Sequence, residues 1–268
     1  RAATTLIIYV GGIFLVGKVA GDFFEYKVNR REMMKQGKWS WEDLRDHIVI
    51  IGTNEDTEHH LRRLIGEFER HEVTAGHDIV LVSESFGEAL PPSLESLGVK
   101  YVSGAATAPD NLARAAVAGA GVVVVLARDD GDARSDGLSF DLMHRIRDVN
   151  PGAQLVAECV DDGNRQRLKD AGATLVARPV RAYPEMIVGA LLNPGVNEVL
   201  ENLFTASGES IRRVEDKLSD RWKNIVNQYV STDQGLPIAY LDMDEHKVIT
   251  APPGGTQVDT EVLFVLMD

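Results

Sequence analysis

The stretch Asp46-His-Ile-Val-Ile-Ile-Gly-Thr-Asn-Glu-Asp-Thr57 decides the expected fold of this chain. It begins with a run of β-branched residues, 48–51, and this run ends on Gly52. A helical pattern follows at once, with apolar side chains three or four positions apart at Leu61, Leu64, Ile65 and Phe68. A strand that turns on a glycine directly into a helix is how a doubly wound nucleotide-binding domain begins.

Strands and helices alternate through residues 46–178. The segment 122–127 is the most apolar, which is typical of a central parallel strand covered on both faces. The expected strands are 48–51, 79–83, 100–102, 122–127, 154–159 and 174–177, and the expected helices are 57–71, 87–97, 111–118, 135–149 and 163–171. We therefore expect an α/β domain, a Rossmann-like parallel sheet of about six strands with crossover helices.

The alternation stops at Pro179. Residues 179–221 are expected to hold crossover or dimerisation helices, because a long amphipathic stretch is interrupted at Asn193-Pro194-Gly195. Two interpretations remain open, namely packing against the chain's own sheet and a helix-swapped dimer interface. Residues 222–268 predict a small, mostly β C-terminal lobe, with strands at 222–230, 238–241, 247–250 and 261–267.

The N-terminal segment differs in character from the rest. Residues 4–21 are apolar apart from Lys18, and at about 1.5 Å per residue they could cross most of a hydrocarbon core of about 30 Å. A cationic flank follows the apolar run, which favours a membrane helix with a cytoplasmic end over a signal peptide. We expect residues 1–25 to be the end of a transmembrane helix and 26–45 to be a linker. Trp39 and Trp41 in this linker mark either a membrane interface or the cover of the next domain.

Composition excludes some classes of function. The chain has 41 acidic and 28 basic residues and a net charge of −13, which argues against a nucleic-acid partner. Cys159 is the single cysteine, so no disulfide can form within the chain, and we expect it to be buried. Neither a Ser/His/Asp signature nor Cys/His metal spacing is present, so we expect that the protein is not an enzyme.

These pieces, in this order, resemble the RCK (regulator of potassium conductance) family, the cytoplasmic gating domains of potassium channels and transporters. The residues that carry the resemblance are 47–52, Gly104-Ala-Ala-Thr-Ala-Pro-Asp-Asn-Leu112, 118–122, Val156-Ala-Glu-Cys159, 168–173, Pro179 and the segments 235–238, 248–253 and 262–265 of the closing lobe. The resemblance implies that residues 1–25 end a pore-lining inner helix, with Gly11 or Gly12 as its hinge and K⁺ as the transported ion. A filter run resembling Thr-Val-Gly-Tyr-Gly is not in this sequence.

A nucleotide site is expected at the glycine turn. Gly52 keeps the first position of Gly-x-Gly-x-x-Gly, whereas Asn54 and Thr57 replace the second and third glycines. Glu84 ends the second strand, where an acidic side chain would bind ribose hydroxyls. Gly104 and Arg128 complete the expected set, and the ligand would be NAD or an adenine nucleotide. The alternative is a vestigial or ion-filled cleft, since Ala105 stands where the family typically has an acid.

A divalent cation, Ca²⁺ or another, is the other ligand that the resemblance implies. Glu158 matches a family carboxylate position, and Asp129 and Asp161 follow the carboxyl ends of adjacent expected strands. Solvated acidic loops are the alternative.

The expected function is that of a cytoplasmic ligand-sensing domain that couples nucleotide or cation binding to the opening of a potassium channel. The resemblance implies RCK dimers within a homotetrameric channel or gating ring, located at the cell membrane with the α/β domains in the cytoplasm. Two alternatives are a membrane-anchored NAD-dependent oxidoreductase and a regulatory subunit of a cation transporter.

Overall fold

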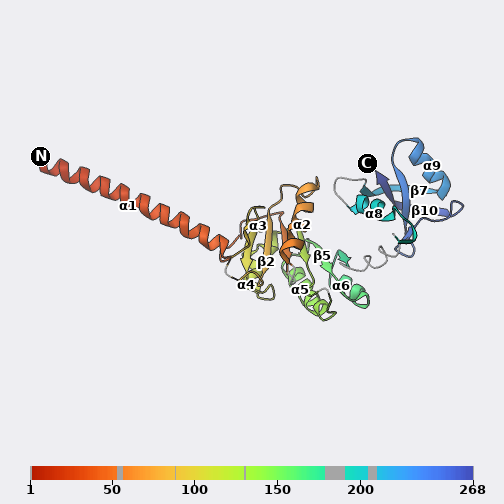
Figure 1. Ribbon diagram of the computed structural model, residues 1–268, viewed down its shortest axis with the longest axis horizontal. Coiled ribbons are helices and arrows are strands. Elements are labelled where there is room, and N and C mark those ends of the chain that lie inside the picture. The colour runs from red at the N-terminus through yellow and green to blue at the C-terminus, as the bar shows by residue number, and fades with distance from the viewer. Residues whose placement is uncertain are drawn as a thin grey trace. The chain divides into compact units, whose positions relative to one another are not determined.

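A computed structural model describes residues 2–52, 57–87, 89–129, 131–178, 191–204 and 210–267, and the side chains at 2–14, 57 and 204 lie outside this description. The predicted crossover segment at 179–190 also lies outside it. The chain divides into two compact units, one made of residues 1–69 and 73–181 and the other of residues 70–72 and 182–268. Each unit is described by itself (Figure 1).

The first unit contains a six-stranded parallel sheet in the order β3-β2-β1-β4-β5-β6. This is the strand order of the doubly wound dinucleotide-binding fold, so the predicted fold class is confirmed. The strands are β1 (Ile48–Ile51), β2 (Ile79–Ser83), β3 (Lys100–Ser103), β4 (Val122–Val125), β5 (Gln154–Glu158) and β6 (Leu175–Ala177). The connecting helices are α2 (Thr57–Arg70), α3 (Pro92–Glu95), α4 (Pro109–Arg114), η1 (Val117–Gly119), α5 (Ser135–Val149), η2 (Asp162–Asn164) and α6 (Arg165–Asp170).

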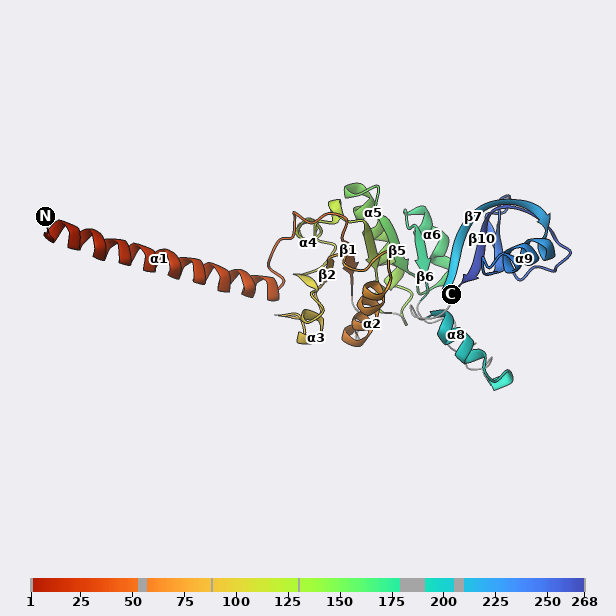
Figure 2. The same cartoon turned by 90° about the horizontal axis from the view of Figure 1, so that it is seen from above.

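Both faces of this sheet are buried, which explains its nearly continuous apolar strands. In β1, Val49 packs with α4, α5 and α6 in one cluster, whereas its neighbour Ile50 packs with α2 and α3 in another. Figure 2 shows α2 and α3 on one side of the strands and α4, α5 and α6 on the other.

The helix α1 (Ala2–Lys35) is continuous through Gly11 and Gly12. Among the residues that the structure describes, no helix is both long enough and apolar enough to cross a membrane. The linker after α1 packs on the first unit: the indole of Trp41 contacts the α4–α6 core cluster and donates a 3.3 Å hydrogen bond to the carbonyl of Tyr101. For Trp41 the structure therefore favours the covering role over a membrane interface.

The second unit has a four-stranded antiparallel sheet in the order β7-β10-β8-β9, with α9 packed on it. Its elements are α8 (Val196–Phe204), β7 (Ser210–Arg221), α9 (Trp222–Ser231), β8 (Leu236–Asp242), β9 (Lys247–Thr250) and β10 (Gln257–Met267). Strands at 236–242, 247–250 and 257–267 agree with the prediction within a few residues.

Two expectations for this unit are wrong. The predicted strand at 222–230 is the helix α9, because Trp222, Ile225 and Tyr229 recur at helical spacing and are all buried. Residues 210–221, placed with the predicted helices, form the long strand β7. Its half-buried positions alternate at Val214, Asp216 and Leu218, and the mostly charged residues between them hide the pattern. The C-terminal sheet therefore begins at Ser210 and not after residue 221.

Candidate functional site

A cleft of about 250 Å³ lies at the carboxyl ends of the central strands of the first unit. This is where the order of a doubly wound sheet reverses between β1 and β4, the usual ligand site of such folds. The cleft is lined by residues from the ends of β1, β2 and β4, from the loop after β3, and from α5: Ile51, Gly52, Val82, Ser83, Glu84, Ser85, Gly104, Ala105, Ala106, Thr107, Leu126, Arg128, Leu138, Ser139 and Leu142.

The two glycines of the cleft carry backbone conformations that other residues rarely adopt. Gly52 has φ +93°, and a Cβ there would lie 3.0 Å from the carbonyl oxygen of Leu126. Gly104 has φ +134°, and a Cβ there would overlap the side-chain amide of Asn111. Both turns therefore require glycine.

Glu84 and Arg128 face each other at the mouth of the cleft. The Arg128 guanidinium lies 3.6 Å from the Glu84 carboxylate, and both side chains are more than half exposed. An exposed pair of this kind contributes about 0–1 kcal/mol, so a ligand can replace it at little cost. The carboxylate can accept hydrogen bonds from ribose hydroxyls, and the guanidinium can bind a phosphate.

The structure thus brings together Gly52, Glu84, Gly104 and Arg128 from the predicted nucleotide set. Asn54 lies outside the described residues, and Thr57 is the first residue of α2, with its side chain outside the description.

Sequence reasoning missed the part of the cleft that α5 supplies. Leu138, Ser139 and Leu142 line it, and Ser139 is almost fully buried. Their spacing predicts that they share one face of a helix. The same spacing is expected for residues that line a cleft and for residues buried in the core, so it does not distinguish the two.

The predicted cation ligands do not gather into one cluster. Among the described residues, no group of three or more His, Cys, Asp and Glu side chains is placed to hold a metal ion. Glu158 accepts a 2.8 Å hydrogen bond from the Ala127 amide, and Asp129 and Asp161 each accept one from a glycine amide in their own loop.

A buried carboxylate, Asp136, holds the loop after β5 and was also missed by the sequence prediction. It accepts hydrogen bonds from the amides of Val160 and Asp161 and from the side chain of Asn164, at 2.8–3.0 Å. Cys159 lies beside it and is buried, as predicted. Burial, reinforced by the Asp136 charge, raises the pKa of the Cys159 thiol to about 11.

The end of α1 is attached next to the cleft. The carbonyl of Gly37 accepts a 2.9 Å hydrogen bond from the Ser103 amide and another from the Arg114 guanidinium. The carbonyl of Lys35 accepts one from the Leu90 amide at 3.3 Å. Ser103 ends β3 and directly precedes Gly104, which lines the cleft. We call residues 35–41 and their contacts on β3 and α4 the α1 joint.

Comparison with known proteins shows which proteins this chain is similar to. Residues 43–156, which hold β1 through most of β5, match the calcium-activated potassium channel slowpoke-like RCK domain. The calcium-gated potassium channel TvoK of Thermoplasma volcanium is 26% identical over 219 residues, which cover 78% of this chain. The match covers 58% of TvoK, so this chain corresponds to less than two thirds of that protein.

Solved structures agree on the fold. The human SLO3 gating ring superposes with a TM-score of 0.59 at 14% identity, covering 82% of this chain and 44% of that one. The GsuK channel bound to NAD superposes with a TM-score of 0.50 at 20% identity, covering 97% and 44%. Residues 43–156 are therefore similar in sequence to the slowpoke-like RCK domain, and the solved structures show the same fold.

Proposed function

We propose that this chain is the ligand-sensing gating part of a potassium channel, in which a nucleotide bound in the cleft acts on α1. One observation carries the proposal. Ser103 holds the α1 joint through its amide, and the next residue, Gly104, lines the cleft. A ligand that moves the turn at Gly104 therefore acts on the group that fixes the end of α1.

The cleft suits NAD or an adenine nucleotide. Gly52 and Gly104 leave backbone accessible for the pyrophosphate, Glu84 would bind ribose, and Arg128 would bind a phosphate. The GsuK structure that superposes on nearly the whole chain contains NAD, which supports this ligand class. The ligand can bias α1 only by the difference between its affinities for the two states of the joint.

The remaining assignments follow from the channel relatives. In this proposal α1 is the end of the pore-lining helix with Gly11 or Gly12 as its hinge, K⁺ is the transported ion, and the domain works in the cytoplasm below the membrane. In the same proposal, copies of the chain pair as RCK dimers within a tetrameric channel or ring; the name of the SLO3 structure supports a ring.

The test is thermal unfolding of the full 268-residue chain with NAD, combined with hydrogen exchange. NAD at about 100 times its Kd should stabilise the chain by about 2.7 kcal/mol, a shift of about 5–10 °C in Tm. It should also slow exchange of the Ser103 amide. Glu84→Gln should weaken NAD binding about tenfold, since a hydrogen bond to a charged group contributes about 1.5–3 kcal/mol. The matched control is Glu261→Gln, an exposed glutamate of the second sheet.

The outcomes separate the two halves of the proposal. If neither NAD nor ADP stabilises the chain, the nucleotide assignment is wrong. If NAD stabilises it while exchange at Ser103 is unchanged, the coupling through the joint is wrong.

Ca²⁺ is a second candidate ligand, because the names of both the family and TvoK include calcium. Asp129 and Asp161 would supply carboxylates from adjacent loops, and Glu158 would join them by giving up its bond to Ala127. Stabilisation by Ca²⁺ that is lost in Asp161→Asn and kept in Asp170→Asn would support this site. Equal responses of the two variants would refute it.

A further inference from the structure

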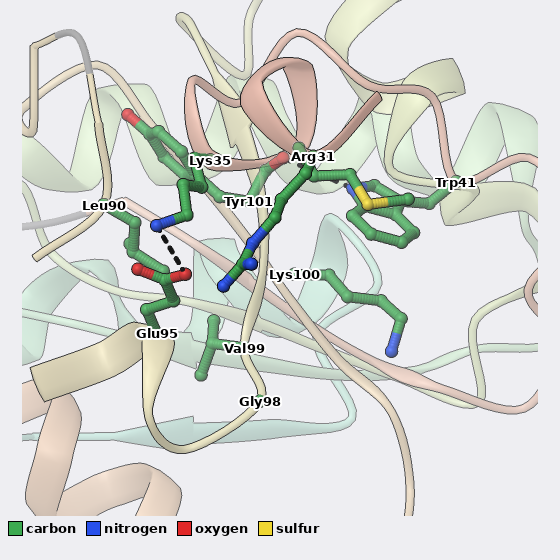
Figure 3. Close-up of a pocket in the computed structure, with 10 residues that line it drawn as sticks. Arg31, Lys35, Trp41, Leu90, Glu95, Gly98, Val99, Lys100 and Tyr101 are labelled. Carbon is green, nitrogen blue, oxygen red and sulfur yellow. Dashed lines mark hydrogen bonds and ion pairs between the residues drawn. The ribbon is translucent and has the colours of Figure 1, made fainter. Parts of the chain in front are cut away.

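A second cavity, of about 260 Å³, lies where the end of α1 meets the linker, α3 and β3. We call it the joint pocket. It is lined by three residues of α1 and by residues of the linker, α3 and β3: Arg31, Met34, Lys35, Trp41, Leu90, Glu95, Gly98, Val99, Lys100 and Tyr101. Its walls therefore come both from α1 and from the α/β domain (Figure 3).

The floor of the joint pocket is apolar and aromatic. Leu90, Val99 and Tyr101 are buried in the core that α2 and α3 cover, and their surfaces face the cavity together with the indole of Trp41. A flat apolar ligand would find a matched surface there, because aromatic rings favour offset or edge contacts with one another. The volume is just below the usual range of about 300–1,000 Å³ for drug-sized ligands, so the occupant must be small.

The rim of the joint pocket is cationic. Figure 3 shows the Arg31 guanidinium extending from α1 between Lys35 and Lys100. Lys35 pairs with Glu95 at 3.1 Å, and Lys100 pairs with Asp78 and lies over the Trp41 ring. Within the described part of the chain, no ion pair or hydrogen bond engages the Arg31 side chain. An incoming anion can therefore bind Arg31 without first displacing another group.

We propose that the joint pocket binds a small aromatic carboxylate. Its carboxylate would pair with the planar guanidinium of Arg31, which matches carboxylate geometry, and Lys35 would add a second positive charge. Its ring would cover Val99 and the edge of Trp41. Since the ligand contacts α1 and β3 at once, it stabilises the attached state of the joint. This site is separate from the nucleotide cleft and would make the joint responsive to a second kind of effector.

The experiment uses the full chain and 4-fluorobenzoate, with fluorine NMR line broadening as the readout of binding. Arg31→Gln should weaken binding at least about tenfold, because a charge-assisted hydrogen bond contributes about 1.5–3 kcal/mol. Arg30→Gln is the matched control: Arg30 is the adjacent residue, but its guanidinium lies over Trp39 at 4.7 Å and does not line the pocket. Glu95→Gln should tighten binding severalfold, because it removes the carboxylate that competes for Lys35. Misfolding of a variant would weaken binding, so tighter binding by Glu95→Gln cannot be explained by misfolding.

Competition decides the chemistry of the ligand. Unlabelled benzoate should displace the probe, whereas neutral benzamide and inorganic phosphate at equal ionic strength should not. Displacement by benzamide would overturn the need for an anion, and displacement by phosphate would overturn the need for a ring. The proposal also fails if 4-fluorobenzoate shows no broadening, or if Arg30→Gln and Arg31→Gln lose affinity equally.

Discussion

The two sheets of this protein use their faces differently. The parallel sheet of the first unit is covered by helices on both faces, so adjacent residues of β1 such as Val49 and Ile50 are equally buried. In the antiparallel sheet of the second unit, burial alternates instead: along the first half of β10, Val258 and Thr260 are buried, whereas Asp259 and Glu261 are exposed. The central strands of the sheet buried on both faces are therefore nearly continuous apolar runs, whereas the sheet buried on one face carries charges along its length.

The difference explains where ligand sites arise. A parallel sheet aligns the carboxyl ends of its strands, so the loops after β1, β2, β3 and β4 meet at one edge and form the cleft. In an antiparallel sheet the carboxyl ends of neighbouring strands lie at opposite edges, so the loops that follow them do not meet at one edge. The sensing chemistry is therefore expected in the first unit.

The largest expected effect comes from truncating core residues on opposite faces of the parallel sheet. Ile50→Ala and Leu155→Ala should each lower the free energy of unfolding by about 2–5 kcal/mol, since each leaves a cavity at a fully buried site. The measurement is urea denaturation, with the alkylation of Cys159 as the readout of unfolding. This thiol is buried and protonated in the folded domain, so it reacts only after the domain unfolds. A cost below about 1 kcal/mol for either variant would show that one face is not a true core.

A smaller effect is expected at Gly37, where the α1 joint meets the edge strand β3. Gly37 has φ +64°, and a Cβ there would overlap the Ser103 amide and the Tyr101 ring. Gly37→Ala should cost about 1–3 kcal/mol and speed tryptic cleavage after the exposed Lys38, because cleavage requires the joint to unfold locally. Gly98→Ala is the control, because Gly98 has a similar φ of +74° but open space around it. Equal losses in both variants would mean that backbone strain, and not the contact with β3, is being measured.

The second sheet should show its own response to alkali. Burial, together with the hydrogen bond from the Tyr229 hydroxyl to Asp216, raises the pKa of Tyr229 to about 12. The folded state thus favours the neutral phenol, and the resulting stability is present below the ordinary pKa of about 10 and is lost as the pH rises toward 12. We expect a loss of about 1–2 kcal/mol over this range, measured by denaturation at each pH. Tyr229→Phe should abolish this loss of stability between pH 10 and pH 12. If the variant loses as much stability over this range as the original chain, the loss does not come from Tyr229.

The smallest effect is expected on the exposed face of the second sheet. Lys217 of β7 and Glu261 of β10 form an ion pair at 3.2 Å, and both side chains are exposed. Lys217→Gln should change the free energy of unfolding by less than about 0.5 kcal/mol, because exposed pairs contribute little. A loss above about 2 kcal/mol would show that this face is covered by something else.

The sequence predicted the parallel sheet well and the second sheet less well. The reason is that the first sheet is buried on both faces and the second on only one. Strands buried on both faces are short runs of Val and Ile, and these have few other interpretations. β7 is mostly charged, and α9 carries Ile225, Val226 and Val230, whose β-branched side chains suggested a strand. In α9 the tertiary packing of Trp222 and Tyr229 decides the outcome, and local propensity does not show it.

The sequence located the cleft because Gly52, Glu84, Gly104 and Arg128 follow predicted parallel strands. It could not reveal the α5 wall, the anchoring role of Asp136 or the joint pocket. Each of these depends on segments far apart in the chain meeting in space, as when Arg31 of α1 comes to lie beside Val99. The path of the linker decides that these residues are close, and no spacing in the sequence predicts this path.

The link between cleft and helix end is made at Ser103 by main-chain atoms, the amide of one residue and the carbonyl of Gly37. Any amino acid other than proline at position 103 can supply that amide. If the proposed coupling runs through this bond, side chains lining the cleft can be exchanged, by evolution or by design, without breaking it. Detection and response would then depend on different atoms, and new ligand specificities could be introduced one pocket residue at a time.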